Sequence, residues 1–329
     1  AKSVGFSGGN GAVSLGVVIA ALVLALVVSS LVPASTRGLD SRPNPVMDYE
    51  QAAGEIERLI AEDERLIRPE CRSTLLTHGE KTQQAVVCFH GLTDSPAQFS
   101  ALGARLFDAG ANVLAPRLPF HGVEGDGIAA LRGLDATAYR DYADKTVDLA
   151  RGLGENIDVI GLSAGGVVAA WIGQNRNDVR RSIAVAPALG IAAGPSFAST
   201  LVENLFTKVR KLKLGRGTSI DVVYSGIPMS ALAETLRLGT AVIAAARTTP
   251  PEAEELVMVL NANDEMVDGS RAAELARRWQ GHGREVVTYE FGAGLRVPHD
   301  AVDPADPEAK TSITYPVLLD LLAGRAPSR

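Results

Sequence analysis

Cysteine, aromatic residues and basic runs are all scarce in this sequence. Only two cysteines occur among 329 residues, which excludes a scaffold built on disulfides and a cysteine-rich zinc site. The formal net charge is −6, and the densest basic stretch, residues 208–216, is typical of a solvated helix face, so we expect no nucleic-acid surface. The chain is 46% hydrophobic, and this composition allows a sizeable core to be buried.

The pairing of the two cysteines, Cys71 and Cys88, is open at this stage. Residues 72–79 and 84–91 could form a hairpin through the turn sequence GEKT, and Cys71 would then lie nearly opposite Cys88. A disulfide would be possible in that arrangement. Two buried free thiols are the ordinary alternative, because a free cysteine behaves as a small hydrophobic residue.

Charged residues are absent from Ser3 to Thr36, and residues 15–32 are predominantly apolar. About 20 apolar residues span a bilayer core as a helix, so residues 1–34 are predicted to be a transmembrane anchor or a signal peptide. The anchor is favoured, but small residues around Ala34 keep cleavage open, and a buried core helix is a third interpretation. We expect a membrane-anchored chain with an extracytoplasmic globular domain, or a secreted one after cleavage.

A polar, proline-containing linker is expected at residues 35–48, followed by a globular domain at residues 49–329. The domain opens with a charged surface helix and continues with apolar stretches that alternate with helix-like ones. The expected strands are residues 72–77, 85–90, 111–116, 157–162, 181–187, 255–262 and 285–291. The expected helices are residues 47–67, 96–110, 136–154, 165–174, 270–280 and 312–324. This alternation favours a doubly wound, mostly parallel sheet, with ligand chemistry at the carboxyl ends of its strands.

One connection is much longer than an ordinary crossover. Residues 191–250 separate two predicted strands and contain two helix-like stretches with apolar faces. An insertion at this place would form a helical lid over the strand ends. The alternative is a pair of packing helices with no role in binding.

Two serines stand in a G-x-S-x-G pattern, Ser7 and Ser163. The pattern has catalytic meaning only between a strand and a helix, where a sharp turn exposes the hydroxyl. Ser163 follows the predicted strand 157–162 and precedes the helix 165–174, whereas Ser7 has neither neighbour. Ser163 is therefore the candidate nucleophile, and small residues around it permit a strained backbone.

A serine nucleophile needs a base and an acid that orients the base. If the chain order is serine, acid, histidine, only His282 and His299 qualify as the base. His299 follows the carboxyl end of the last strand, and His282 lies at the opposite end of that strand, so His299 is chosen. The candidate acids after strand 255–262 are Asp264, Glu265 and Asp268. Asp264 comes first off the strand, and Asp268 could instead cap the following helix.

Backbone N–H groups could stabilise the oxyanion of such a reaction. Their candidates by position are Leu92, in the turn after strand 85–90, and Ala164, directly after the nucleophile. The neighbouring His90 is expected to be a buried histidine that holds this turn by hydrogen bonds.

Five motifs in this order resemble those of the α/β-hydrolase family, from about Arg72 to the end of the chain. The motifs are FHGLTDSP (89–96), RLPFHG (117–122), GLSAGG (161–166), NDEMV (263–267) and PHD (298–300). The chain is most similar to the branch of carboxylesterases and monoacylglycerol lipases with H-G-[hydrophobic]-T before the first core helix. Many relatives have glycine where Phe120 stands. The resemblance implies a triad of Ser163, Asp264 and His299 with an oxyanion hole at Leu92 and Ala164, and it implies no cofactor or metal.

The expected function is hydrolysis of carboxylic esters, and the apolar lid and membrane-proximal position suggest acyl or lipid-like substrates. The expected partners are a small-molecule ester and, through the N-terminal segment, a membrane. On the same fold, an acyltransferase, a thioesterase, an amidase or a cofactor-free peroxidase is an alternative, because fold does not fix chemistry. A catalytically silent binding protein and a membrane-tethered structural partner are the alternatives outside enzymes.

Overall fold

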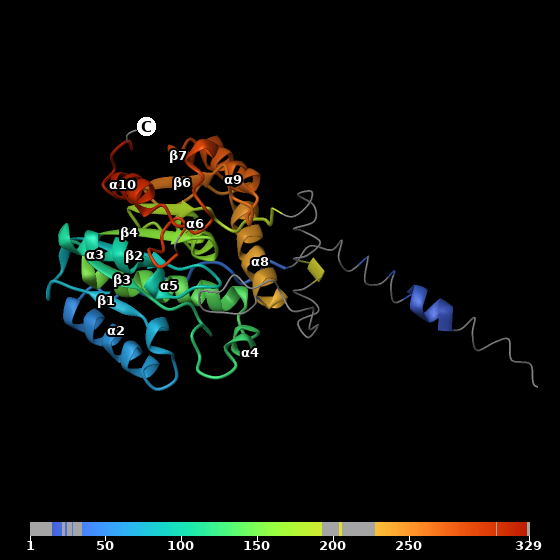
Figure 1. The fold of residues 1–329 in the computed structure, drawn as a ribbon, viewed down its shortest axis with the longest axis horizontal. Coiled ribbons are helices and arrows are strands. Elements are labelled where there is room, and N and C mark those ends of the chain that lie inside the picture. The colour runs from blue at the N-terminus through green and yellow to red at the C-terminus, as the bar shows by residue number, and fades with distance from the viewer. Residues whose placement is uncertain are drawn as a thin grey trace, which may run out of the picture.

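The computed structural model describes residues 15–21, 24, 28, 35–192, 204–205, 228–306 and 308–327. Within them, one seven-stranded sheet crosses the domain in the order β1-β3-β2-β4-β5-β6-β7 (Figure 1). Its strands are β1 (Thr74–Leu76), β2 (Thr82–Phe89), β3 (Asn112–Ala115), β4 (Gly154–Leu162), β5 (Arg181–Val185), β6 (Glu255–Asn261) and β7 (Val286–Phe291). β1 is antiparallel to β3 and the remaining neighbours are parallel, which confirms the predicted doubly wound, mostly parallel sheet.

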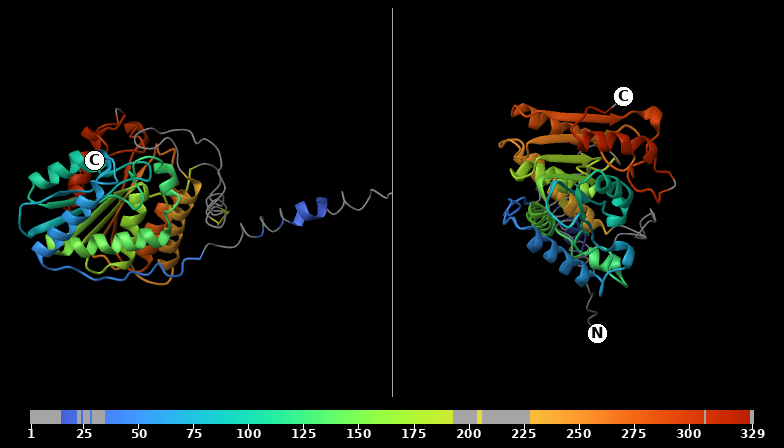
Figure 2. Two further views of the ribbon diagram at one scale, coloured as in Figure 1. Left: turned by 90° about the horizontal axis from the view of Figure 1, so that it is seen from below. Right: turned by 90° about the vertical axis from the view of Figure 1, so that its left-hand side faces the viewer.

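Helices cover both faces of this sheet (Figures 1 and 2). α5 (Ala136–Leu153), α6 (Ala164–Asn175) and α9 (Gly269–Gly281) lie on one face, and α2 (Tyr49–Asp63) and α8 (Met229–Ala245) pack outside them. α3 (Ser100–Asp108) and α10 (Thr311–Leu322) lie on the other face, where the guanidinium of Arg105 stacks over the ring of Tyr315. The short elements are α4 (Gly127–Leu131) and the 3₁₀ turns η1 (Pro69–Cys71), η2 (Pro96–Phe99) and η3 (Ala293–Leu295).

The central strands and the helix behind them form the core. Every residue of β5 is buried, and so are all but the last residue of α6, because helices shield both sides of the sheet. α6 is apolar along nearly its whole length, and β5 ends in the apolar residues Ile183, Ala184 and Val185, and that is why the sequence predicts them well. α6 thereby presents its N-terminus at the carboxyl end of β4, where the chain turns sharply.

The hairpin that residues 72–79 and 84–91 could have formed is absent. β1 pairs with β3 instead, and β3 separates it from β2. The side chain of Asn112 fixes this connection, because its Oδ1 accepts from the N–H of His78 and its Nδ2 donates to the carbonyl of Glu80. Cys71 and Cys88 are therefore not opposite each other, and both are buried free thiols.

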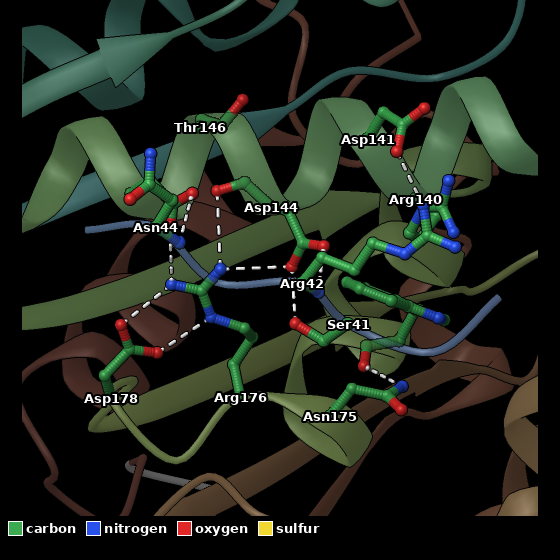
Figure 3. Close-up of polar contacts among 12 residues, drawn as sticks. Ser41, Arg42, Asn44, Arg140, Asp141, Asp144, Thr146, Asn175, Arg176 and Asp178 are labelled. Carbon is green, nitrogen blue, oxygen red and sulfur yellow. Dashed lines mark hydrogen bonds and ion pairs between the residues drawn. The ribbon is translucent and has the colours of Figure 1, made fainter. Parts of the chain in front are cut away.

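The segment predicted as a linker, residues 35–48, directly precedes α2 and lies against the domain. Residues 35–46, here called the N-terminal strap, dock against α5 and α6 (Figure 3). The Asp144 carboxylate accepts from the hydroxyl of Ser41 and the N–H of Arg42, and Asp148 accepts from the N–H of Asn44. Both carboxylates also bind the buried guanidinium of Arg176, at 3.0 and 2.7 Å. A buried ionic network thus holds the strap in place.

The predicted N-terminal membrane segment falls mostly outside the described residues. Residues 15–21 are helical and exposed. In the part of the chain that the structure describes, none of the helices has the length and apolar character needed to cross a membrane.

Candidate active site

Ser163 lies at a strained turn between β4 and α6. Its φ of 58° and ψ of −114° are unfavourable for a residue with a side chain, and its N–H donates to the carbonyl of Val185 at 3.0 Å. The glycines of the motif are required by close packing. A Cβ on Gly161 would lie 2.1 Å from the carbonyl oxygen of Gly165, and a Cβ on Gly165 would lie 1.9 Å from that of Phe89. The turn can therefore exist only with glycine at both positions.

Asp264 and His299 meet beside this turn. Nδ1 of His299 lies 2.7 Å from Oδ2 of Asp264. The other carboxylate oxygen, Oδ1, accepts from the N–H groups of Met266 and Val267 at 2.9 and 3.0 Å. Burial acts to raise the pKa of Asp264, but the hydrogen bond and charge of His299, with the two N–H groups, bring it below the ordinary value. Asp264 is thus a carboxylate that orients the imidazole by Nδ1–H and leaves Nε2 available.

The other candidate acids lie in different surroundings. Asp268 caps α9, where its Oδ1 accepts from the N–H of Ser270 at 2.9 Å, as the sequence suggested for it. Glu265 is exposed at the rim of a pocket.

A pocket of about 570 Å³ brings four of the five predicted site residues together. Ser163, His299, Leu92 and Ala164 line it, and Asp264 lies behind His299. Leu232 and Thr235 of α8 also line the pocket, so the described end of the predicted insertion 191–250 does border the site. Most of the rest of that insertion lies outside the described residues.

The two predicted oxyanion donors belong to peptide units whose carbonyl groups are held by two hydrogen bonds each. The carbonyl of Gly91, which shares its peptide with the N–H of Leu92, interacts with Nδ1 of His90 at 2.8 Å and with the N–H of Asp94 at 3.2 Å. The carbonyl of Ser163, which shares its peptide with the N–H of Ala164, accepts from the N–H groups of Val167 and Ala188. In a trans peptide the N–H points away from the C=O, so these bonds fix both N–H directions.

Two buried histidines hold the turn that carries Leu92. Nε2 of His90 accepts from the N–H of Leu118 at 3.0 Å, so Nδ1 carries the proton that bonds the carbonyl of Gly91. Burial lowers the pKa of His90 well below its ordinary value. Nε2 of His121 lies 2.8 Å from the carbonyl of Leu92, and burial lowers the pKa of His121 to about 4. Both rings are neutral structural histidines, as expected for His90.

The other two histidines lie away from the pocket. His282 ends α9, and its ring bonds the carbonyl of Ala246 at 3.0 Å. His78 is exposed and stacks on Phe107. His299 is therefore the histidine that lines the pocket.

Phe120 has a backbone that suits glycine. Its φ is 67°, in the left-handed region, and its side chain is 39% exposed. The glycine that many relatives have at this position is explained by that conformation. Here the ring of Phe120 packs over Gly133, where a Cβ would lie 2.9 Å from the ring.

Sequence reasoning missed a group of polar residues beside the site. Gln98 bridges the N–H of Gly91 and the carboxylate of Asp300, and carboxyl oxygens of Asp94, Asp300 and Asp303 lie within 4.8 Å of one another. Three carboxyl groups this close could suit a cation, and one of them, Asp300, also accepts from Gln98. Gln98 and Asp300 are 202 residues apart, and no periodicity or motif links them.

A sequence model of the alpha/beta hydrolase family matches residues 86–310. No curated protein gives a significant match. Three similar solved structures share the fold. One, from work on LipS and LipT, two metagenome-derived lipolytic enzymes, is 17% identical, with a TM-score of 0.58 over 79% of this chain and 100% of its own. The monoacylglycerol lipase of Paleococcus ferrophilus is 16% identical, with a TM-score of 0.57 over 78% of this chain and 99% of its own. A soluble variant of the monoglyceride lipase of Saccharomyces cerevisiae is 12% identical, with a TM-score of 0.56 over 77% and 90%.

Proposed function

The chain belongs to the alpha/beta hydrolase family, and from this premise we propose that it is a serine esterase of the carboxylesterase and lipase branch. The observation that carries the proposal is the geometry around one pocket. A strained serine at the head of a buried helix shares that pocket with a histidine, and a carboxylate holds the histidine by Nδ1 at 2.7 Å. This is the set of groups that nucleophilic catalysis by a serine requires.

In the proposed mechanism, Nε2 of His299 takes the proton of the Ser163 hydroxyl as Oγ attacks the ester carbonyl carbon. The carbonyl oxygen becomes an oxyanion, which the N–H groups of Leu92 and Ala164 stabilise. Asp264 keeps the ring oriented and stabilises the imidazolium. The imidazolium then gives its proton to the leaving alcohol, and the C–O bond of the ester breaks to leave an acyl-serine.

Water completes the cycle by the same groups. His299 takes a proton from the water as its oxygen attacks the acyl-serine, and a second oxyanion forms in the same hole. The proton passes to Oγ of Ser163 as the acid leaves. No step requires a metal or cofactor.

The proposed substrates are esters with an acyl or lipid-like chain. The pocket is lined in large part by apolar residues, and the larger of them are Leu92, Leu162, Ile191, Leu232, Met266, Val267 and Val297. A cavity of about 570 Å³ lies in the range of small-molecule sites, which are mostly apolar with few polar groups. The lipolytic enzymes and monoacylglycerol lipases among the structural neighbours support this choice of substrate class.

The deciding experiment compares the wild type, Ser163→Ala and Ser100→Ala on p-nitrophenyl butyrate, p-nitrophenyl laurate and a monoacylglycerol. Ser100 is an exposed serine at the start of α3 and serves as the matched control. We expect turnover and labelling by a fluorophosphonate in the wild type and the control, and neither in Ser163→Ala. A folded wild type that neither hydrolyses an ester nor takes the label would contradict the proposal.

The lid and the membrane attachment stay proposals of the same kind. An N-terminal anchor would hold the pocket near lipid substrates in the membrane. A lid would cover the opening of that pocket. Removal of residues 1–34 should leave hydrolysis of a soluble ester unchanged and abolish cofractionation with membranes.

A further inference from the structure

The side chain of Gln98 connects the turn that carries Leu92, in the proposed oxyanion hole, with the turn that carries the proposed base His299. Oε1 of Gln98 accepts from the N–H of Gly91 at 2.9 Å, and Nε2 of Gln98 donates to Oδ2 of Asp300 at 2.7 Å. Gly91 precedes Leu92, and Asp300 follows His299. The carboxamide of Gln98, which is 3% exposed, therefore joins the two loops on which the proposed chemistry depends.

Both ends of this bridge are held by further bonds. The other oxygen of Asp300, Oδ1, accepts from the N–H groups of Val302 and Asp303 at 3.0 and 2.9 Å, so the carboxylate is fixed within its own turn. The Gly91 residue lies beside the nucleophile, because a Cβ on it would lie 3.8 Å from Cβ of Ser163 and from both polar atoms of Gln98. A shift of the bridge would thus move the Leu92 N–H relative to His299.

Two more carboxyl groups, those of Asp94 and Asp303, lie beside the carboxylate of Asp300. Burial, with the charges of Asp300 and Asp303 after it, raises the pKa of Asp94 to about 8, although the N–H of Ser95 acts to lower it. Asp94 is accordingly protonated at neutral pH and can share a hydrogen bond with Asp300. The bridge therefore ends on a carboxylate that also accepts from the N–H groups of Val302 and Asp303 and lies beside the protonated Asp94.

We propose that Gln98 is a positioning residue. By bridging Gly91 and Asp300, it fixes the position of the Leu92 N–H, in the oxyanion hole, relative to the base His299. The inference rests on the proposed function, since it concerns the same site. Gln98 does not touch the reacting atoms, and it acts through the two loops. The transition state needs both loops at once, because the oxyanion and the imidazolium form in the same step, whereas binding of the ground state does not.

The test exchanges the hydrogen-bond donor and acceptor at the contact between residues 98 and 300. In Gln98→Glu, one carboxylate oxygen still accepts from Gly91, but the other faces Oδ2 of Asp300 and repels it. In Asp300→Asn, the N–H groups of Val302 and Asp303 keep the amide oxygen at the Oδ1 position, so Nδ2 faces Nε2 of Gln98 and the bond is lost. In the double variant, the glutamate accepts from the asparagine amide, and the number of carboxyl groups equals that of the wild type.

We expect each single variant to lower kcat for p-nitrophenyl butyrate about 10- to 100-fold with little change in KM, since displacements of about 1 Å cost about 100-fold. The double variant should recover to within about threefold of the wild type. Asp303→Asn removes a neighbouring carboxylate and leaves both bonds of the bridge intact, so it is the matched control and should retain the wild-type kcat. Thermal melting of every variant checks folding.

The outcomes separate this inference from the proposed function. Single variants with the wild-type kcat, or a folded double variant that is no faster than the singles, would overturn the role of Gln98 while the wild type stays an esterase. If a single variant does not fold, the kcat of the folded double variant, compared with that of the wild type, still tests the role of Gln98. A wild type inert towards both the ester and a fluorophosphonate would overturn the proposed function and this inference together.

Discussion

The substitution Asp264→Asn tests the proposed triad most directly. Oδ1 of Asp264 accepts two N–H groups, from Met266 and Val267, while Oδ2 faces Nδ1 of His299. An asparagine at this position keeps its amide oxygen towards the two N–H groups, because the flipped amide would lose two hydrogen bonds of about 0.5–1.5 kcal/mol each. Its NH₂ group must then face Nδ1 of His299.

This orientation inverts the tautomer of the imidazole. Nδ1 becomes an acceptor and the proton moves to Nε2, so the nitrogen that faces the pocket can no longer take a proton from Ser163. We expect kcat for an ester to fall by about 10⁴, the loss that the wrong tautomer causes in serine hydrolases. At about 1.36 kcal/mol per factor of ten, this corresponds to roughly 5 kcal/mol of transition-state stabilisation.

Steady-state hydrolysis of p-nitrophenyl butyrate measures the loss, and Asp268→Asn is the matched control. Asp268 was the rival acid, and its contact with the N–H of Ser270 survives the change to asparagine. The control should therefore keep the wild-type kcat. An Asp264→Asn variant within tenfold of the wild type, or a larger loss in Asp268→Asn, would refute the assignment of the acid.

Two further predictions concern the turn and the carboxyl group beside the site. Gly165→Ala should unfold or destabilise the protein by more than the roughly 1–3 kcal/mol typical of overpacking, because its Cβ would lie 1.9 Å from the carbonyl of Phe89. Gly54→Ala, on a helix with nothing within 4 Å, should gain about 0.5–1 kcal/mol, and equal denaturation midpoints for the two variants would contradict the packing argument. Asp94→Asn should become more stable relative to the wild type as the pH rises from about 4 to about 8. The raised pKa of Asp94 means that over this window the unfolded state has released the proton while the folded state keeps it, so the wild type loses stability as the pH rises. Melting curves at pH 5 and pH 9 with the same difference would be incompatible with a protonated Asp94.

Most of the fold can be read from the order of apolar stretches. All seven predicted strands are present, because strands shielded by helices carry runs of apolar residues that stand out in the sequence. The possible hairpin does not form at the edge of the sheet, where β1 has three residues and is only partly buried. There the side chain of Asn112 selects the partner strand, and no local pattern announces that choice.

The predicted site residues lie together for a reason already present in the sequence. Each lies in the segment after the carboxyl end of a strand, and the carboxyl ends of parallel strands meet at one edge of the sheet. Their number and order could therefore be inferred from strand ends. The structure adds the distance between Asp264 and His299 and the hydrogen bonds that aim the peptides of Leu92 and Ala164. Their roles in catalysis stay predictions until activity is measured.

The sequence by itself determined the alternation of elements, the sharp turn at Ser163 and the order of serine, acid and histidine along the chain. These features depend on local periodicity and on the small residues that a tight turn needs. The tertiary structure decided the pairing of β1, the docking of the N-terminal strap on Arg176 and its carboxylates, and the bridge from Gly91 through Gln98 to Asp300. Those contacts join residues that are far apart in sequence, so their geometry exists only after the sheet has brought the loops together.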